Sequence, residues 1–172
     1  MTEEIVWNKD CWQTPNTEKQ PILSLVRDVF DGLICLDPCT MPNNPTKAKY
    51  YFTEADDFLS QTPSIIYDNC WMNPPFSKPA PFLEKMFDWY KTGHIVQAIA
   101  LLKSGTMHNQ STSHIINQSR SICFWRSPRI AFLNNLGNPK KKADFDCILV
   151  YFGPDHWEFY KTFKSRGIIR SH

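Results

Sequence analysis

The sequence predicts one α/β domain, and three observations support this fold class. Its 172 residues, of which 42% are apolar, can bury one substantial core but are too few for two comfortable domains. Short apolar runs rich in β-branched and aromatic residues indicate buried strands, and amphipathic stretches between them indicate helices. Helices and strands that alternate along a chain favour an α/β sheet, which binds ligands at the carboxyl ends of its strands.

Six apolar runs have the length and composition of strands. They cover residues 33–36, 65–71, 95–102, 122–125, 130–133 and 148–152. Several of these runs lack polar alternation, which indicates strands covered on both faces. Two sequences that can bind a ligand, DPC at residues 37–39 and NPP at residues 73–75, fall at strand ends. We therefore expect the functional site at that edge of the sheet.

Two stretches carry apolar residues at helical spacing. The first is 18–30, with Ile22, Leu25, Val26 and Val29 on one stripe, and the second is 81–90, with Phe82, Leu83, Met86 and Trp89. Gly93 follows the second stretch and suits the left-handed residue that ends a helix. WQTP at residues 12–15 is expected to open the first helix, with the Thr14 hydroxyl as its cap and Pro15 in its first turn. The same hydroxyl and the backbone there can instead bind a carboxylate.

The charge balance limits the classes of partner. Lys and Arg total 19 against 17 Asp and Glu, so the formal net charge is only +2, unlike that of strongly basic nucleic-acid-binding proteins. Any anionic partner must therefore be met locally. The N-terminal sequence MTEEIVWNKDCW lacks the pattern of a signal peptide, and no run of about 18 apolar residues predicts a membrane helix. We expect a cytoplasmic protein without membrane contact.

The six cysteines are expected to be reduced thiols. They form no C-x-x-C pair, and three of them lie inside apolar runs, namely Cys35, Cys123 and Cys147. The five histidines show no ligand spacing with these cysteines. The sequence therefore favours a protein without a metal site.

The tetrapeptide Asn73-Pro74-Pro75-Phe76 contains two residues that fix φ and lack an amide hydrogen, so no regular element runs through it. One interpretation is a proline-rich turn whose Phe76 packs against the core. The other is a clamp for an adenine amine, in which the Asn73 side-chain oxygen and the Pro74 carbonyl accept the amine hydrogens. Two hydrogen bonds from the amine N–H groups raise the electron density on the nitrogen, while Phe76 stacks on the base. The strand before the motif and the acidic strand end upstream favour the second interpretation.

Acidic residues occur in two further motifs. Asp37, in LDPCT, lies at a strand end where it can hold a cationic or hydroxylated cofactor, but an Asp there also suits a turn or a helix cap. TEADDFL contains Glu54, Asp56 and Asp57. One of these can reach the adenine amine or a ribose hydroxyl of a cofactor, or all three can form a solvated turn.

Positive charge gathers beside aromatic residues in the last third of the chain. The basic residues are Arg126, Arg129, Lys140, Lys141 and Lys142, close in sequence to Trp125 and Phe132. This mixture suits DNA phosphates, and it is also typical of a soluble basic loop.

Six segments, read in order, resemble the short phage-type DNA N6-adenine methyltransferases, or Dam family. They are WQTP, LDPCT, KAKYYFTEADDFLSQ, WMNPPFS, AIALLKSGT and SPRIAF, and the resemblance runs from Trp12 to Gly153. NPPF alone is shared with many amino-methyltransferases, whereas the ordered set is far more specific. Two departures are the Phe76 ring in place of the commoner Tyr and the missing glycine-rich cofactor loop of larger methyltransferases.

The resemblance implies a Rossmann-like, S-adenosylmethionine-dependent methyltransferase fold over residues 1–172, with a mixed, mainly parallel sheet and flanking helices. It also implies methyl transfer from S-adenosylmethionine to N6 of an adenine flipped out of double-stranded DNA. The implied cofactor-binding residues are Trp12, Thr14, Pro15, Asp37, Cys39 and Asp57, and the implied catalytic residues are Asn73, Pro74, Pro75 and Phe76. DNA contacts are expected at Ser77, Lys78, Arg126, Arg129, Lys140, Lys141 and Lys142.

Little sequence remains for a separate target-recognition domain, so loops within residues 103–145 are expected to read the DNA. The resemblance places the protein in the cytoplasm of a bacterial or phage-infected cell. Two alternatives stay open. The few glycines near Asp37 suggest a non-catalytic DNA-binding or decoy protein on a degenerate methyltransferase scaffold, and the shared NPPF suggests a methyltransferase that acts on protein glutamine amides.

Overall fold

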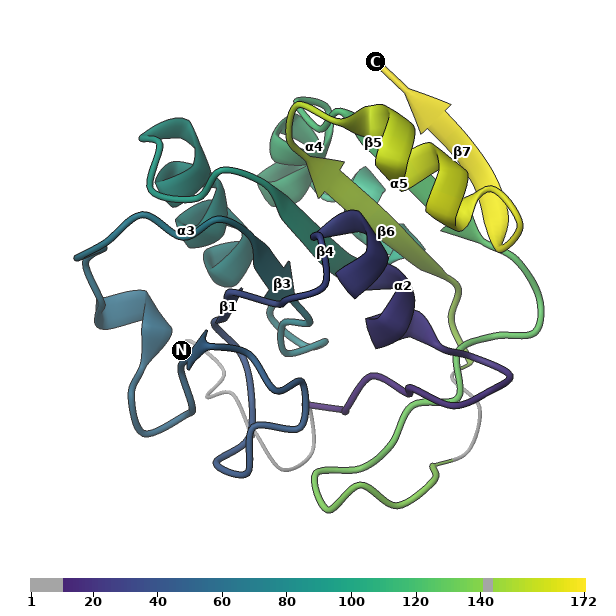
Figure 1. Cartoon of the computed structure of the whole chain (residues 1–172), viewed down its shortest axis with the longest axis horizontal. Coiled ribbons are helices and arrows are strands. Elements are labelled where there is room, and N and C mark those ends of the chain that lie inside the picture. The colour runs from purple at the N-terminus through teal and green to yellow at the C-terminus, as the bar shows by residue number, and fades with distance from the viewer. Residues whose placement is uncertain (1–10, 141–143) are drawn as a thin grey trace.

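A computed structural model describes residues 11–140 and 144–172, which form a sheet with helices on both faces (Figure 1). The helices are α2 (Ile22–Val29), α3 (Ala80–Lys91), α4 (Gln110–Ile116) and α5 (His156–Phe163), with the short 3₁₀ turns η1 (Phe58–Ser60) and η2 (Ser104–His108). The strands are β1 (Leu36–Asp37), β2 (Tyr50–Tyr51), β3 (Cys70–Met72), β4 (Ala98–Lys103), β5 (Ser121–Trp125), β6 (Cys147–Phe152) and β7 (Gly167–Ser171).

The sheet joins a parallel half to an antiparallel half. Its strand order is β2-β1-β3-β4-β6-β5-β7. Neighbours from β2 to β4 are parallel, whereas β6 is antiparallel to β4 and β5, and β7 is antiparallel to β5. The strands β1 to β5 therefore share one direction, and β6 and β7 run in the other. This arrangement, with helices on both faces, confirms the expected α/β, Rossmann-like fold class.

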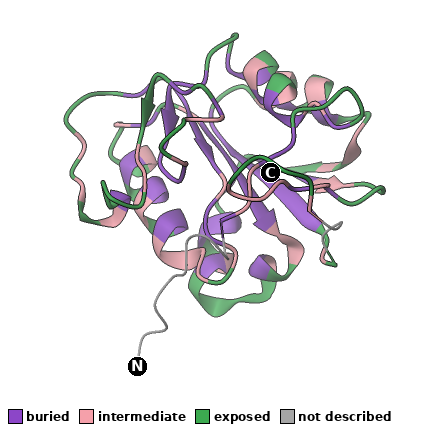
Figure 2. Cartoon of the chain, turned by 90° about the horizontal axis from the view of Figure 1, so that it is seen from below, coloured by how far each residue is buried: buried purple, intermediate pink, exposed green. Residues whose placement is uncertain are grey.

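Side chains alternate across the central strands, so the sheet supports two cores. On β4, Ala98, Ala100 and Leu102 pack in a cluster that includes buried residues of α3 and α4. Ile99 and Leu101 belong to the opposite cluster, with buried residues of α2 and α5. Figure 1 shows these helix pairs on opposite faces, and Figure 2 shows the buried strands between them. Burial on both faces explains why the strands read as continuous apolar runs.

The N-terminal part of the chain differs from its prediction. WQTP does not open a helix, because α2 starts only at Ile22. The chain before α2 is instead held against the loop after β5, where the Gln13 N–H donates to the Leu133 carbonyl (2.8 Å) and the Leu133 N–H donates to the Gln13 carbonyl (3.0 Å). These two bonds compete with helical pairing for the same backbone groups, so Thr14 caps no helix.

The strand predicted at residues 130–133 is wrong. Within the described loop after β5, Leu133 forms isolated bridges to Gln13 and Pro139 but no ladder. Ile130 and Phe132 are buried in the α2 and α5 core. Their apolar character therefore reflects packing of a loop onto the core, not membership of a strand.

Other predicted elements are confirmed with shifted ends. α3 contains the helix expected at residues 81–90, and Gly93 follows it with a φ of 81°. β3 occupies only the end of its apolar run, and Ile65 and Ile66 before it are 40% and 65% exposed. The sequence did not predict β2, β7, α4 or α5, because these elements are short or partly exposed.

All six cysteines lie in the described residues, where they are buried and form no disulfide. Burial raises the pKa of the Cys123 and Cys147 thiols to about 12, so both are neutral at physiological pH. The expectation of core thiols is confirmed. Within residues 11–140 and 144–172, every helix is too short or too polar to cross a lipid bilayer.

Candidate active site

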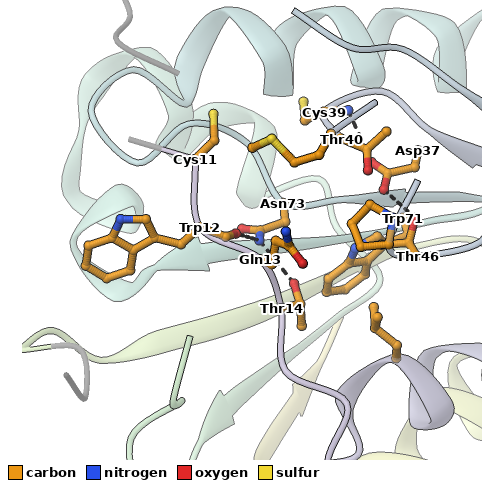
Figure 3. A pocket seen from close by; sticks show the side chains of 13 residues that line it. Cys11, Trp12, Gln13, Thr14, Asp37, Cys39, Thr40, Thr46, Trp71 and Asn73 are labelled. Carbon is orange, nitrogen blue, oxygen red and sulfur yellow. Dashed lines mark hydrogen bonds between the residues drawn. The ribbon is translucent and has the colours of Figure 1, made fainter. Parts of the chain in front are cut away.

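Polar side chains meet at the carboxyl ends of the parallel strands. β1 ends at Asp37, and Asn73 directly follows the neighbouring parallel strand β3. Both residues line a pocket with about 380 Å³ of space, including the part open to solvent. The full lining, seen in Figure 3, is Cys11, Trp12, Gln13, Thr14, Leu23, Asp37, Cys39, Thr40, Met41, Pro45, Thr46, Trp71 and Asn73. The structure therefore places a pocket at the edge that the sequence predicts.

Asp37 is a buried acid with internal hydrogen bonds. Its side-chain oxygens accept from the Cys39 N–H (3.1 Å) and the Thr46 hydroxyl (2.6 Å), and 1% of the residue is exposed. Burial raises the pKa of Asp37 to about 6, and the hydrogen bonds from Thr46 and Cys39 offset part of this increase. The carboxyl group is therefore mostly ionised above neutral pH and gives the pocket a buried negative charge.

Asn73 is oriented by the chain before α2. Its side-chain NH₂ donates to the Trp12 carbonyl (2.7 Å) and to the Thr14 hydroxyl oxygen (3.0 Å). Its side-chain oxygen is buried and has no hydrogen-bond partner among the described residues. A buried acceptor without a donor is unfavourable in a folded protein, so this atom is suited to a donor supplied by a ligand.

The rest of the tetrapeptide is packed. Pro74 and Pro75 are buried, and Phe76 is half-buried. Phe76 belongs to an aromatic cluster with Trp12, Phe132 and Phe145. Its ring centroid lies 5.1 to 5.3 Å from the centroids of the other three rings. The Lys103 ammonium lies 5.7 Å from the Phe76 ring centroid. Phe76 therefore packs as an ordinary turn residue does, and it also keeps the partial exposure that a stacking platform requires.

Four of the six expected cofactor residues line the pocket, namely Trp12, Thr14, Asp37 and Cys39. Pro15 is buried next to Thr14 in the sequence but does not line the pocket. Asp57 is exposed on the turn that precedes η1, with a φ of 48°, and it also lies outside the lining. The Asp56 carboxylate accepts from the Thr53 N–H and hydroxyl, each at 2.8 Å, so it stabilises that turn.

Sequence reasoning did not identify Thr46, which closes the pocket over Asp37. The loop that carries it turns back at Asn44, whose φ is 47° and whose carbonyl accepts from the Lys47 N–H (2.9 Å). Its sequence, PNNP at residues 42–45, is typical of a turn. That signal predicts a reversal of the chain, but it does not say which group the returning hydroxyl meets.

The expected DNA contacts differ in their surroundings. Ser77 is exposed and Lys78 is half-buried in the turn after the tetrapeptide. The Arg126 guanidinium donates to a main-chain carbonyl before β7 (2.7 Å), and Arg129 forms an exposed ion pair with Asp146 (3.0 Å). Both arginines therefore have protein partners, which a DNA phosphate would have to share or replace.

Residues 132–140 form a hairpin-like arm beside the aromatic cluster. The Asn134 N–H donates to the Asn138 carbonyl (2.8 Å), and the Lys140 N–H donates back to the first residue of the arm (3.1 Å). Leu136, at the tip, is 77% exposed. The segment at 103–145 thus contains this arm in addition to η2, α4 and β5.

The lysine run after the arm is only partly described. The Lys140 ammonium lies 3.8 Å from the Trp12 ring centroid, and burial lowers the pKa of Lys140. Lys141 and Lys142 lie outside the described residues. Over the described residues, no three His, Cys, Asp or Glu side chains are grouped as metal ligands.

Fold and pocket together define a Rossmann-like α/β domain whose pocket brings a strand-end acid together with the first residue of an Asn-Pro-Pro-Phe turn. Comparison with known proteins makes the class specific. The chain belongs to the DNA N-6-adenine-methyltransferase (Dam) family, whose model matches residues 2–169. It is 27% identical over 161 residues to the DNA N-6-adenine-methyltransferase of Haemophilus phage HP1 (strain HP1c1), which covers 86% of this chain and 80% of the phage protein. The family resemblance found in the sequence is confirmed.

Proposed function

We propose that the protein transfers a methyl group from S-adenosylmethionine to N6 of an adenine in double-stranded DNA. The observation that carries the proposal is the buried side-chain oxygen of Asn73, which has no donor among the described residues and belongs to a residue that lines the same pocket as Asp37. Family membership supports the DNA adenine substrate. In the proposed reaction the amine nitrogen bonds to the methyl carbon as the carbon–sulfur bond breaks, the bonding pair stays on sulfur, and a proton leaves the nitrogen for solvent.

The pocket residues fit a cationic methyl donor. S-adenosylmethionine, when bound, supplies a methyl group on a positively charged sulfur and also carries an ammonium group. The Asp37 carboxylate is a negative charge in surroundings of low polarity, where its attraction for a cation is stronger than in water. Trp12 and Cys39 line the pocket around this charge and are the proposed further contacts, whereas Thr14 lines the same pocket with its hydroxyl hydrogen-bonded to Asn73. Pro15 and Asp57 do not line the pocket, and they are proposed to contact parts of the cofactor that extend beyond it.

The tetrapeptide is proposed to hold the flipped adenine. The Asn73 oxygen accepts a hydrogen bond from one amine N–H and the Pro74 carbonyl accepts one from the other. Both bonds make the nitrogen a better nucleophile. Pro74 and Pro75 are buried and fix the turn before the base arrives. Stacking on the half-exposed Phe76 offsets part of the few kcal/mol needed to take a base out of the helix.

DNA is proposed to lie across the carboxyl edge of the parallel strands, against residues 77–78, the described basic side chains and the 132–140 arm. Lys140 brings positive charge next to Trp12, and Leu136 presents an exposed apolar tip. Arg126 and Arg129 are proposed to exchange their protein partners for phosphates. Because DNA is the proposed substrate and a phage protein is a relative, the protein is proposed to act in the cytoplasm of a bacterial or phage-infected cell.

Methyl-transfer assays test the proposal directly. Purified protein is incubated with S-adenosylmethionine labelled in its methyl group and with either double-stranded DNA or a protein extract, and nucleosides from the DNA are then separated. Label in N6-methyladenine supports the proposal. Label in protein alone would favour a glutamine-amide acceptor. A protein that binds DNA but gives no calorimetric heat with S-adenosylmethionine would be a non-catalytic decoy.

A further inference from the structure

We infer that Thr14, together with the Trp12 carbonyl, is a positioning residue that fixes the orientation of the Asn73 amide. The inference rests on the proposed methyl transfer, and it assigns Thr14 a different task from cofactor binding. A side-chain amide has an acceptor end and a donor end of almost the same shape. Only one of the two orientations leaves the acceptor available to an amine, so something must select it.

The contacts of Asn73 make that selection. A carbonyl oxygen can only accept hydrogen bonds, so the amide atom 2.7 Å from the Trp12 carbonyl must be the NH₂ group. The second hydrogen of this NH₂ is used by the Thr14 hydroxyl oxygen at 3.0 Å. Both donors are then satisfied, and the remaining terminal atom is the unpartnered oxygen. A flipped amide would lose the bond to the Trp12 carbonyl and bring two acceptor oxygens together, even if the Thr14 hydroxyl rotated to donate to it.

The supporting segment is itself held in place. Gln13, between the two supporting residues, exchanges both main-chain hydrogen bonds with Leu133, and its side chain donates to the Asn135 carbonyl (2.9 Å). Thr14 is 7% exposed and Trp12 lies in the aromatic cluster. The acceptors that orient Asn73 therefore have little freedom to move away from it.

This arrangement requires an amide rather than a carboxylate at position 73. An ionised Asp has oxygen at both positions and no hydrogen to donate, so one oxygen would face the Trp12 carbonyl. The Thr14 hydroxyl can rotate to donate to an Asp, but the main-chain carbonyl cannot adapt in this way. Asn73→Asp is therefore expected to lose most methyl transfer, even though Asp also offers an acceptor.

The decisive experiment compares Thr14→Val with Thr14→Ser. Val keeps the shape of Thr but cannot accept a hydrogen bond, whereas Ser keeps the hydroxyl. Methyl transfer is measured as kcat, as KM for DNA and as calorimetric Kd for S-adenosylmethionine. We expect Thr14→Val to lower kcat about tenfold, the effect of losing one hydrogen bond that orients the Asn73 amide, with the cofactor Kd within about twofold of wild type. Thr14→Ser should restore kcat to within about threefold of wild type.

A second measurement keeps the inference testable if Thr14→Val also weakens folding. Unfolding is followed for Thr14→Val, Asn73→Ala and the double variant. If the two side chains share a hydrogen bond, the two single changes cost more stability in sum than the double change costs. A cofactor Kd that rises with kcat unchanged would instead make Thr14 a cofactor contact and overturn the inference. Wild-type protein without methyl transfer would be a separate result, because it contradicts the proposed function itself.

Discussion

Asp37 and Asn73 follow neighbouring parallel strands and line the same pocket, but the protein satisfies their polar atoms in opposite ways. Both oxygens of Asp37 accept hydrogen bonds from the protein, from Cys39 and Thr46. Asn73 has both donors satisfied, and its acceptor has no partner in the part of the chain that the structure describes. At the Asp37 end of the pocket each carboxylate oxygen therefore already has a protein donor, whereas at the Asn73 end the amide oxygen has none among the described residues.

The difference separates two ways of binding. A carboxylate whose oxygens are already occupied acts on a ligand mainly through its charge, which reaches beyond contact distance. An unpartnered amide oxygen acts only on a donor that touches it at hydrogen-bond distance. The Asp37 end is thus suited to hold a cation without strict direction, and the Asn73 end is suited to align one particular N–H group for reaction. Each prediction below tests one side of this contrast.

The largest expected effect comes from Asn73→Ala. Removing the acceptor should lower kcat about 100-fold or more, by analogy with the loss of one preorganised hydrogen bond to a reacting group. The melting temperature should change little, because two hydrogen bonds are lost but a buried unpartnered oxygen is also removed. Labelled methyl transfer and thermal melts measure the two effects separately.

Asn69 provides the matched control. It is a buried asparagine directly before the strand β3, and its oxygen accepts from the Cys35 N–H (2.7 Å) while its NH₂ donates to the Leu33 carbonyl (2.9 Å). Asn69→Ala should destabilise the fold by about 2–3 kcal/mol, because it leaves buried main-chain groups unpaired. The folded fraction should keep its kcat. If Asn73→Ala behaves like Asn69→Ala in both assays, Asn73 is a structural residue and the contrast fails.

The second expected effect is on cofactor affinity and concerns Asp37→Asn. Loss of the buried charge should weaken the calorimetric Kd for S-adenosylmethionine at pH 8 by at least about tenfold. In wild type the affinity should rise between pH 5 and pH 7, because the pKa of Asp37 is about 6 and only the ionised form attracts a cation. The Asn variant should show a nearly flat profile. A variant with the same pH dependence as wild type would remove Asp37 from this role.

The Asp37 carboxyl group should make folding stability fall as the pH rises, which is opposite to its effect on cofactor affinity. The pKa of Asp37 in the folded state, about 6, lies above its ordinary value of 3.8, so the folded protein binds the proton more tightly than the unfolded chain. The stability from this group is therefore full below pH 4 and is lost as the pH rises through 6, by on the order of 3 kcal/mol. Asp37→Asn should escape this loss, and urea unfolding at pH 4 and pH 8 measures it.

The fold was predictable where the pattern of apolar residues is local. Continuous apolar runs such as residues 95–102 indicate strands covered on both faces, and β4 is covered in this way. The run at residues 130–133 has a similar composition but lies in a loop, because Ile130 and Phe132 are buried against α2 and α5. Composition records burial, and it does not record whether the burial takes place in a strand.

The site was predictable to the extent that strand ends mark it. Asp37 and Asn73 could be placed together because parallel strands end at the same edge of a sheet. The support of Asn73 by Thr14 joins residues 59 positions apart, and no periodicity encodes such a pair. For the same reason WQTP suggested a helix cap: its local chemistry fits a cap, but pairing of Gln13 with Leu133 takes the segment elsewhere.

A smaller effect is expected at the tip of the 132–140 arm, which is proposed to contact DNA. Leu136→Ser should raise the KM for DNA about fivefold, the loss expected for one apolar contact, and leave the cofactor Kd unchanged. Leu136 is 77% exposed, so thermal stability should not change. Ile168→Ser on β7, at a residue that is 59% exposed, is the matched control and should leave the KM for DNA at its wild-type value. Equal effects of both variants would mean that the arm does not contact DNA.

The smallest effect is expected on the turn between β2 and η1, which borders the Asp37 end. The N–H of Thr40, which lines the pocket, donates to the carbonyl of Phe52 (3.1 Å), and the turn begins directly after Phe52. Asp57→Asn removes a charge without strain, because Asn tolerates the left-handed φ of 48° that Asp57 adopts. The Kd for S-adenosylmethionine should rise about threefold, as expected for one exposed polar contact.

Asp56→Asn is the control for this substitution. The hydrogen bonds from Thr53 hold the pKa of Asp56 below its ordinary value, so this carboxylate is already engaged in the turn. An Asn oxygen can accept the same two bonds, and the cofactor Kd should stay at its wild-type value. If Asp57→Asn also leaves the Kd unchanged, the turn has no part in cofactor binding. The charge at the Asp37 end must then come from Asp37 itself, because it is the acid that lines the described pocket.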